Sequence, residues 1–407
     1  MAPTAPLYAI LIFAATYLVL ALGRLPGFRV DRTGAAIIGA TLMVALNVLT
    51  VTDAVEAINT DTILLLFGMM IVVANLRLSG IFALVTEWVV EHAHRPLVLL
   101  SAIVAISGVF SAFFVNDTMC LVLTPLVLDV TTQLRRNPIP YLLAVAMASN
   151  IGSVATVTGN PQNMLIASFS GIQYRAFAAA LSPVALAGLV AVIGVIALAY
   201  RGEFLTATPR VVIQGPAVRV HRALAWKSTI TSACMITAFF LGWPIAKVAL
   251  VAGALLLVTR RVKPERVYAE IDWSLLVLFI GLFIVVRGVE KTSLSTDLFA
   301  IASRLHLERT SVMSAFSAVL SNIVSNVPAV LVFRPFIPHL ADPRHAWLTL
   351  AMSSTLAGNL TVLGSVANLI VVQRARHKVR ITFWEYTRVG APLTALTIVI
   401  GVALLNG

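Results

Sequence analysis

Two short polar groups lie within long apolar stretches of this chain of 407 residues. Asn116, Asp117 and Thr118 occur in "FFVNDTM", and Ser325 and Asn326 occur in "IVSNVPA". Carboxylate, carboxamide and hydroxyl oxygens suit a cation such as Na+, and a carboxylate can also carry a proton. Because an acid in an apolar segment is rare and costly, we expect Asp117, with Asn116 and Asn326, to bind an ion or proton. The alternative is that Asp117 only caps the helix that follows it.

Two further polar groups interrupt apolar segments that would otherwise form continuous helices. They are "ATVTGNPQNM" (155–164) and "NLTVLGSVAN" (359–368). Gly and Pro break a helix and free backbone NH and C=O groups, which cost several kcal/mol each in lipid unless they face protein or water. Free amides suit an anion, and free carbonyls and carboxamides suit a cation, although a break can also serve helix packing alone. The residues predicted to bind a small ion or anion are Asn116, Thr118, Thr156, Thr158, Gly159, Asn160, Asn163, Ser325, Asn326, Thr361, Gly364, Ser365 and Asn368.

The composition indicates a polytopic membrane protein that consists of α-helices. Hydrophobic residues make up 59% of the chain and charged residues 11%, whereas a soluble chain has about a quarter charged residues. The mean hydropathy is +0.95. The net charge of +12 comes from basic residues in short loops, which is typical of cytoplasmic loops and does not indicate a nucleic-acid partner.

Ten apolar segments are long enough to cross a bilayer once each. Two other regions, 96–132 and 310–338, each have an apolar limb, a polar tip and a short second limb, so we expect re-entrant hairpins. Segment 79–93 mixes apolar and charged residues and is expected to lie at the membrane interface. The predicted spans are 6–23, 33–51, 61–76, 139–170, 174–200, 227–242, 245–259, 273–289, 346–372 and 383–405.

The two halves of the chain repeat in order and in spacing. Gly68 matches Gly281 in "LLLFGMMIVV" and "VLFIGLFIVV", Asn116 matches Asn326, and Gly159 matches Gly364. Chance similarity between apolar helices would align Leu and Val rather than Asn, Gly and Thr. Each repeat has five spans and one hairpin, and an odd number of spans makes the repeat inverted. We therefore predict two repeats, 1–205 and 227–407, joined by a cytoplasmic linker, 206–226, with broken helices at the membrane midplane.

Loop charge predicts the orientation in the membrane. Basic residues concentrate in the loop after the first span, the central linker and loops near 260–266 and 374–380, whereas 50–61 has no Lys or Arg. The positive-inside rule then places both termini outside the cell membrane, the inner membrane in a bacterium. Hairpin 96–132 would enter from the cytoplasm and hairpin 310–338 from outside. Arg334, in the second hairpin, could attract an anion, pair with a carboxylate or extend to the surface.

No pattern in the sequence indicates an enzyme. The seven histidines fall in or near loops without metal-ligand spacing, and no Ser-His-Asp, HExxH or P-loop pattern occurs. We therefore expect no metal centre and no cofactor, apart from a possible bound Na+. Paired broken helices and hairpin tips instead point to a transport site near the midplane.

The chain resembles the ion transporter superfamily in its citrate transporter-like permease group. This group includes arsenite-pump permeases, Na+/H+ antiporters of the NhaD type and divalent-anion/Na+ symporters. The resemblance covers nearly the whole chain and implies scaffold and transport domains, a homodimer and elevator-type movement. The symporters carry Ser-Asn-Thr at both hairpin tips, whereas the tips here are closer to the arsenite-permease and antiporter branch. The residues that carry the resemblance are "FFVNDTMCLVLTPLV" (113–127), "SNIGSVATVTGNPQN" (149–163), "SNIVSNVPAVLV" (321–332) and "AGNLTVLGSVAN" (357–368).

The resemblance and the residues together give one leading hypothesis and two alternatives. The first is a secondary active transporter of a small anion, either an inorganic, arsenite-like oxyanion or a carboxylate, driven by Na+ or H+ through Asp117. In the second, a Na+/H+ antiporter, Asp117 binds the transported ion itself. The third is an ion channel, whose flux would not saturate.

Cysteines placed at Asn116 and Asn326 test the predicted site. We expect a transported substrate to protect both from water-soluble thiol reagents, because both hairpin tips would line the binding site. Labelling rates with and without substrate provide the measurement. If neither position responds to a substrate that is transported, the site lies elsewhere.

Overall fold

The computed structural model describes residues 5–25, 27–82, 84–85, 95–205, 221–259, 262–291 and 306–406. These residues are helical apart from turns and loops, with one isolated bridge between Arg24 and Asp31 and no strand. Helices occupy each of the ten predicted spans, although the number that crosses a bilayer stays a prediction. Among the helices of the described residues, five are long and apolar enough to cross a membrane: α4 (Thr60–Ser79), α6 (Pro96–Phe113), α10 (Tyr174–Ala199), α15 (Trp273–Glu290) and α21 (Phe383–Asn406).

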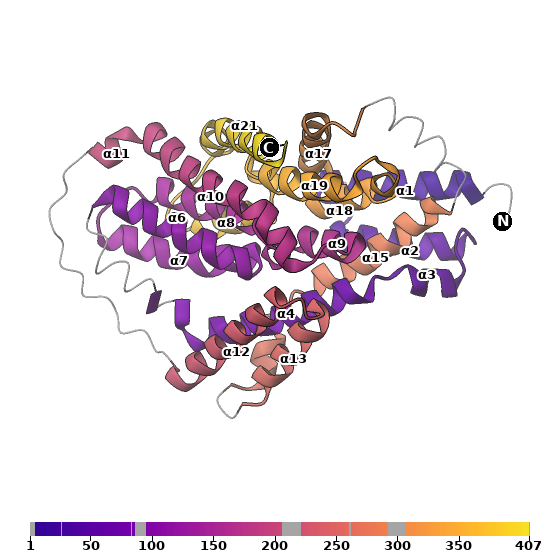
Figure 1. The fold of residues 1–407 in the computed structure, drawn as a ribbon, viewed down its shortest axis with the longest axis horizontal. Coiled ribbons are helices and arrows are strands. Elements are labelled where there is room, and N and C mark those ends of the chain that lie inside the picture. Colours follow the sequence, from indigo (N-terminus) through magenta and orange to yellow (C-terminus); the bar gives the residue numbers. More distant parts are fainter. Residues whose placement is uncertain are drawn as a thin grey trace.

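The helices form two groups (Figure 1). The α4 group contains α4 and α15 with α1 (Ala5–Leu22), α2 (Arg32–Ala45), α12 (Arg222–Phe240) and α13 (Ile245–Leu257). The α8 group contains α6, α10 and α21 with α8 (Pro138–Ser153) and α19 (Pro343–Ala357) at its centre. The short helices α3 (Val51–Ala57), α11 (Arg201–Leu205) and α14 (Pro264–Tyr268) lie in connections.

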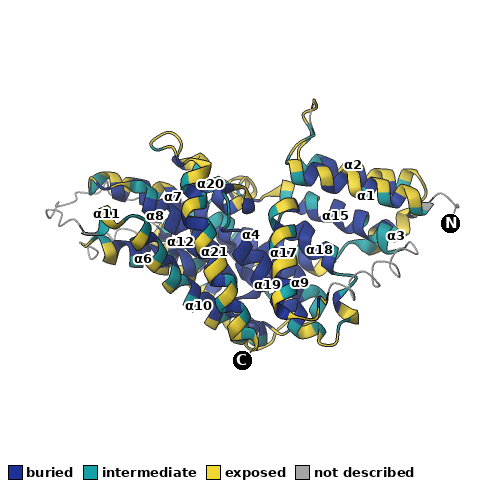
Figure 2. Ribbon diagram, turned by 90° about the horizontal axis from the view of Figure 1, so that it is seen from above, coloured by how far each residue is buried: buried dark blue, intermediate teal, exposed yellow. Residues whose placement is uncertain are grey.

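Exposure differs strongly between the helices of the α8 group (Figure 2). Every residue of α8 from Pro140 to Ser153 is buried. In contrast, α10 and α21 show exposed faces that carry large apolar side chains, among them Leu186, Val190 and Val399. Apolar faces of this kind on long helices fit contact with lipid rather than with water.

Both predicted helix breaks are present. After α8 the chain forms a short 3-10 turn, η1 (Val157–Gly159), and then α9 (Pro161–Ser170). After α19 it forms η3 (Val362–Gly364) and then α20 (Val366–Ala375). Thr156 and Thr361, which precede the two turns, have nearly identical backbone angles, φ −138° and ψ 166° against φ −137° and ψ 167°.

Regions 96–132 and 310–338 each contain two helices joined at a polar tip, and the second limbs differ in length. The first consists of α6 and α7 (Asn116–Gln133), and the second of α17 (Thr310–Val324) and α18 (Asn326–Phe333). The second limb α18 has only 8 residues and is followed by the turn η2 (Ile337–His339). The second limb α7 has 18 residues and is longer than expected. Threonine hydroxyls can compete with the backbone for hydrogen bonds and so weaken a helix. In α7, Thr124 and Thr131 instead donate their hydroxyls to carbonyls of the same helix, and the helix continues past them.

Parts of two predicted segments lie outside the described residues. The interfacial segment 79–93 is described only to residue 85, with residue 83 left out, and helix α4 itself continues to Ser79. Residues 206–220 of the predicted linker are likewise outside. Helix α12 begins at Arg222, within the range predicted for the linker.

Two close contacts each join one pair of helices in the α4 group. Gly68 of α4 packs on the backbone of Ala249 in α13, and Gly281 of α15 packs on the backbone of Ala36 in α2. A Cβ at Gly68 would lie 2.6 Å from the carbonyl carbon of Ala249, and a Cβ at Gly281 would lie 2.8 Å from that of Ala36. Small residues of this kind let the backbones of two helices approach closely.

Replacing Gly68 by alanine tests this packing. We expect Gly68→Ala to destabilise the protein by about 1–3 kcal/mol, because the backbone of α13 must move. Gly194→Ala in α10 is the matched control, since a Cβ there would meet no atom within 4 Å. Thermal unfolding in detergent compares the two variants. Equal melting temperatures would show that the contact does not limit stability.

Candidate functional site

One carboxamide secures each helix break. Asn163 donates from Nδ2 to the carbonyls of Ser153 and Thr156, each at 3.0 Å. Asn368 donates in the same way to Gly358 at 2.7 Å and Thr361 at 2.9 Å. These carbonyls belong to the ends of α8 and α19 and to the turns that follow, where no intrahelical donor remains. The predicted residues Asn163 and Asn368 therefore pair the backbone groups that the breaks expose.

The second limb of each break begins with a side-chain cap. Asn160 accepts a hydrogen bond from the Asn163 amide at 2.8 Å, and Pro161 follows it at the first helical position. Ser365 accepts a hydrogen bond from the Ala367 amide at 3.2 Å. The Asn-Pro pair, which has no exact counterpart in the second half, thus performs a local task by starting α9.

Each break requires a glycine, because the chain passes very close to the backbone at the end of the preceding helix. Gly159 lies so near the carbonyl of Ser153 that a Cβ would overlap it, and a Cβ at Gly364 would lie 2.8 Å from the carbonyl oxygen of Gly358. Both glycines sit where the chain folds back over the end of the preceding helix. Their role in this structure is to permit the turn.

Asn150 in α8 connects the two halves. Its Oδ1 accepts from Asn116 Nδ2 at 3.0 Å and from Ser365 Oγ at 3.1 Å. Its Nδ2 donates to Asn359 Oδ1 and to Asn368 Oδ1, each at 2.9 Å. A carboxamide has two donors and two acceptor positions, so every position of Asn150 is used. The first hairpin tip and the second break are therefore tied to one buried side chain.

Thr355 in α19 has a corresponding place opposite the first break. Its hydroxyl accepts from Asn160 Nδ2 at 3.3 Å and from Gln162 Nε2 at 3.2 Å. The last turn of each central helix thus bonds to the break of the other half. The two breaks are held against each other through α8 and α19.

A cavity of about 190 Å³ lies where the tips and the breaks meet the α4 group. Six helices begin at this cavity: α2, α7, α9, α15, α18 and α20. Its described polar and charged lining residues are Arg32, Thr33, Asn116, Asp117, Gln162, Asp272, Ser274, Ser325, Asn326 and Ser365.

Asp117 does not cap its own helix. The N-cap position of α7 is Val115, which makes no side-chain cap. Asp117 instead lines the cavity together with Asp272 and with Ser365 and Val366 at the start of α20. The first tip thus places a carboxyl group in the cavity that the second break also borders.

The two tips present different groups to the cavity. Asn116 is buried, and its Oδ1 has no hydrogen-bond partner among the described residues. Such an atom is usually paired, so a cation or a donor from a ligand would complete it. At the other tip, Ser325 has a φ of 79°, and Asn326 Oδ1 accepts from Ser321 Oγ at 2.5 Å.

The structure gathers some predicted site residues at the cavity and places the others behind it. Thr156 donates to the carbonyl of Ala112, and Thr158 bonds to the Tyr174 hydroxyl at 3.0 Å, so both brace the first break. The predicted residues at the cavity are Asn116, Asp117, Ser325, Asn326 and Ser365. The predicted residues that do not line it are Thr118, Thr156, Thr158, Gly159, Asn160, Asn163, Thr361, Gly364 and Asn368.

Arg334 lies outside the cavity. Its Nε is 3.6 Å from Glu290 Oε1, and its guanidinium lies 4.3 Å from the centre of the Phe169 ring. Of the alternatives that the sequence left open, the structure shows the ion pair. The described residues contain no group of three or more His, Cys, Asp or Glu side chains that could hold a metal ion.

Sequence reasoning missed several polar residues of this region, among them Arg32, Asn150, Gln162 and Asp272. Arg32 and Asp272 directly precede predicted spans, where a charged residue is normally interpreted as part of a solvent-exposed loop. Asn150 and Gln162 lie in segments that were recognised as polar. Their cross-half partners, more than 190 positions away in the chain, have no signal in a single sequence.

Replacing Asn150 by alanine tests its connecting role. We expect Asn150→Ala to cost about 2 kcal/mol or more, because it leaves several buried polar groups unpaired. Asn75→Ala is the matched control, since Asn75 is also fully buried but donates only to Ile71 of its own helix. Thermal unfolding in detergent compares the two. Equal losses of stability would contradict the connecting role.

Comparisons with known proteins agree with this architecture. A model of the citrate transporter family matches residues 8–357. An uncharacterised transporter of Mycobacterium tuberculosis is 31% identical over 98% of this chain and 97% of its own length. The silicon efflux transporter of rice, Oryza sativa subsp. japonica, is 28% identical over 97% of this chain and 96% of its own length.

Two less similar proteins also match over most of this chain. The putative transporter arsB of Dictyostelium discoideum is 24% identical over 92% of this chain and 87% of its own length. The solved structure of the Alcanivorax borkumensis YdaH transporter matches with a TM-score of 0.60 and 17% identity, over 99% of this chain and 97% of that one. At this identity the structural likeness speaks for the fold alone. The chain is a multi-pass membrane protein of the secondary transporter type, and it belongs to the citrate transporter family.

Proposed function

We propose that the protein is a secondary active transporter that moves a small anion across the membrane, coupled to a Na+ or H+ gradient. The observation that carries the proposal is the convergence of six helix N-termini on one cavity. Each N-terminus acts as roughly half a positive charge and directs free NH groups outward. Their sum favours a negatively charged or oxygen-rich substrate.

The charges at the cavity support cation coupling. Asp117 and Asp272 oppose one guanidinium, that of Arg32, among the described lining residues. An anion that enters next to two carboxylates needs a compensating cation or proton. Asp117, with the unpaired Oδ1 of Asn116 beside it, is the site we propose for that coupling ion, and Asn326 completes it from the second tip.

Matching contacts support an inverted repeat of five spans and one hairpin in each half. The bonds of Asn163 to Ser153 and Thr156 recur 205 positions later in Asn368, Gly358 and Thr361. The contacts of Gly68 with Ala249 and of Ala36 with Gly281 are related by 213 positions, from 68 to 281 and from 36 to 249. We propose repeats 1–205 and 227–407, about ten transmembrane helices, and breaks at the midplane.

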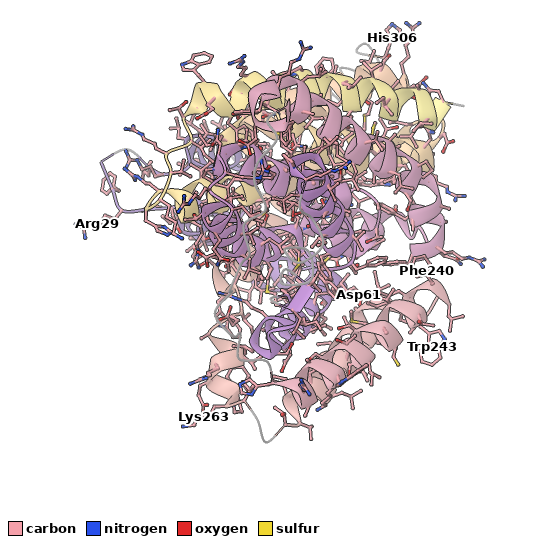
Figure 3. The ribbon with its side chains drawn as sticks, turned by 90° about the vertical axis from the view of Figure 1, so that its left-hand side faces the viewer. Arg29, Asp61, Phe240, Trp243, Lys263 and His306 are labelled. Carbon is pink, nitrogen blue, oxygen red and sulfur yellow. The ribbon has the colours of Figure 1, made fainter. Side chains whose placement is uncertain are left out.

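A second cavity supports an elevator-type movement. It has about 340 Å³ and is lined by the starts of α4 and α13, including Asp61 and Ala246 (Figure 3 labels Asp61). These positions correspond, at an offset of 213, to Ser274 and Thr33 at the first cavity. The α4 group thus presents equivalent helix ends to two cavities. We propose that the tips and breaks move between them.

The relatives suggest candidate substrates. The family is described as citrate transporters, and two relatives are named as a silicon efflux transporter and a putative arsB transporter. We propose a small inorganic oxyanion, arsenite-like, or a carboxylate. A homodimer in the inner membrane with both termini outside completes the proposal. The second candidate is a Na+/H+ antiporter, which the paired oxygens of Asp117 and Asn116 also favour.

Transport by proteoliposomes tests the proposal. Uptake of citrate, arsenate, arsenite and silicic acid is measured under a Na+ or a pH gradient. An anion that moves only with the cation gradient supports anion transport. A Na+-driven pH change without any anion supports the antiporter, and transport of none of the probes under any gradient contradicts the proposed function.

Replacing Asp117 by asparagine tests the coupling site. We expect Asp117→Asn to abolish coupled transport and to leave expression and folding intact, because the carboxamide cannot carry the charge or the proton. Asp129→Asn on the same helix is the matched control. Its side chain is 60% exposed and pairs with Lys378 at 2.7 Å, away from the cavity. Normal coupled transport by Asp117→Asn would remove Asp117 from the mechanism.

A further inference from the structure

Arg32 is the one basic side chain among the described residues that line the 190 Å³ cavity. It is the first residue of α2 and is half-buried. Its Nε donates to the carbonyl of Leu20 at 3.1 Å, which fixes the plane of the guanidinium. Its two terminal nitrogens have no hydrogen-bond or ion-pair partner within the described part of the chain.

Other partly buried arginines of the described chain differ in this respect. Arg77 pairs with Glu270, Arg136 with Glu203, and Arg334 with Glu290. A guanidinium is always charged and presents its donors as a planar fork that matches a carboxylate or an oxyanion. An arginine that borders a polar cavity without a carboxylate partner is therefore ready to bind an anion there.

Two contacts hold together the helices on the Arg32 side of the cavity. Helices α2 and α15 meet through the close contact of Gly281 with Ala36 and through the bond from Thr33 Oγ1 to the Ser274 carbonyl at 3.3 Å. The hairpin tips, with Asn116 and Asn326, line the same cavity. An anion in this cavity would thus meet both the helix ends of the tips and Arg32.

We propose that Arg32 binds the anionic group of the substrate and thereby sets the preference for anions over uncharged oxyacids. The assignment rests on the proposed function and refines it. Arg32 belongs to the α4 group, whereas the helices of the tips and breaks pack on α8 and α19 of the α8 group. The contact therefore exists only while the cavity faces the starts of α2 and α15, so Arg32 acts on one side of the transport cycle.

The test measures binding of three probes to the purified full-length protein by thermal shift and calorimetry. Citrate and arsenate are anionic at neutral pH, and silicic acid is uncharged. The variants are Arg32→Gln and Arg32→Lys. Arg29→Gln, three residues earlier in the loop before α2, is the matched control with the same loss of charge, because its side chain points into solvent (Figure 3).

We expect Arg32→Gln to weaken the binding of citrate or arsenate at least about 10-fold and to leave silicic acid unaffected, since only a charged partner loses the guanidinium bonds. Arg32→Lys keeps the charge but loses the planar fork of donors, so its loss of affinity for citrate or arsenate should be intermediate. This variant also provides the test if Arg32→Gln fails to fold. Equal binding by the wild type, Arg29→Gln and the two Arg32 variants would overturn the assignment. So would a wild type that binds silicic acid alone. A wild type that binds none of the probes contradicts the proposed function, and the assignment with it.

Discussion

The structure depends on how the backbone groups exposed by two broken helices are paired in an apolar interior. An unpaired carbonyl at such depth costs several kcal/mol, so a break cannot persist without a donor. Asn163 and Asn368 supply that donor, and each secures two carbonyls. The capped starts of α9 and α20 follow from this pairing, because the same turns bring Asn160 and Ser365 into position.

Once the breaks are fixed, the cavity follows. Asn150 connects the first hairpin tip to the second break by hydrogen bonds, and Thr355 connects α19 to the first break. These bonds bring the starts of four interrupted helices together, and α2 and α15 add two more from the α4 group. The result is a small polar space with an excess of helix N-termini, in which Asp117 and Arg32 supply opposite charges. The proposed anion attraction and the proposed cation coupling would thus both follow from one arrangement.

The sequence alone predicted the residues that recur in both halves of the chain. It missed the residues whose role depends on contacts between distant segments. Gly159, Asn163, Gly364 and Asn368 were found because apolar helices have little other reason to keep such residues in register. Their task, however, is to hold the breaks rather than to line the cavity. Arg32 was not recognised, because a base at the end of a span has the same signal whether it faces a cavity or water.

An experimental structure with a bound probe tests the central claim most directly. Cryo-electron microscopy of the full-length protein with citrate, arsenate or silicic acid would locate the ligand. The account predicts density in the cavity between Asn116 and Asn326, within reach of Arg32. Density confined to a site remote from both hairpin tips and both breaks would contradict it.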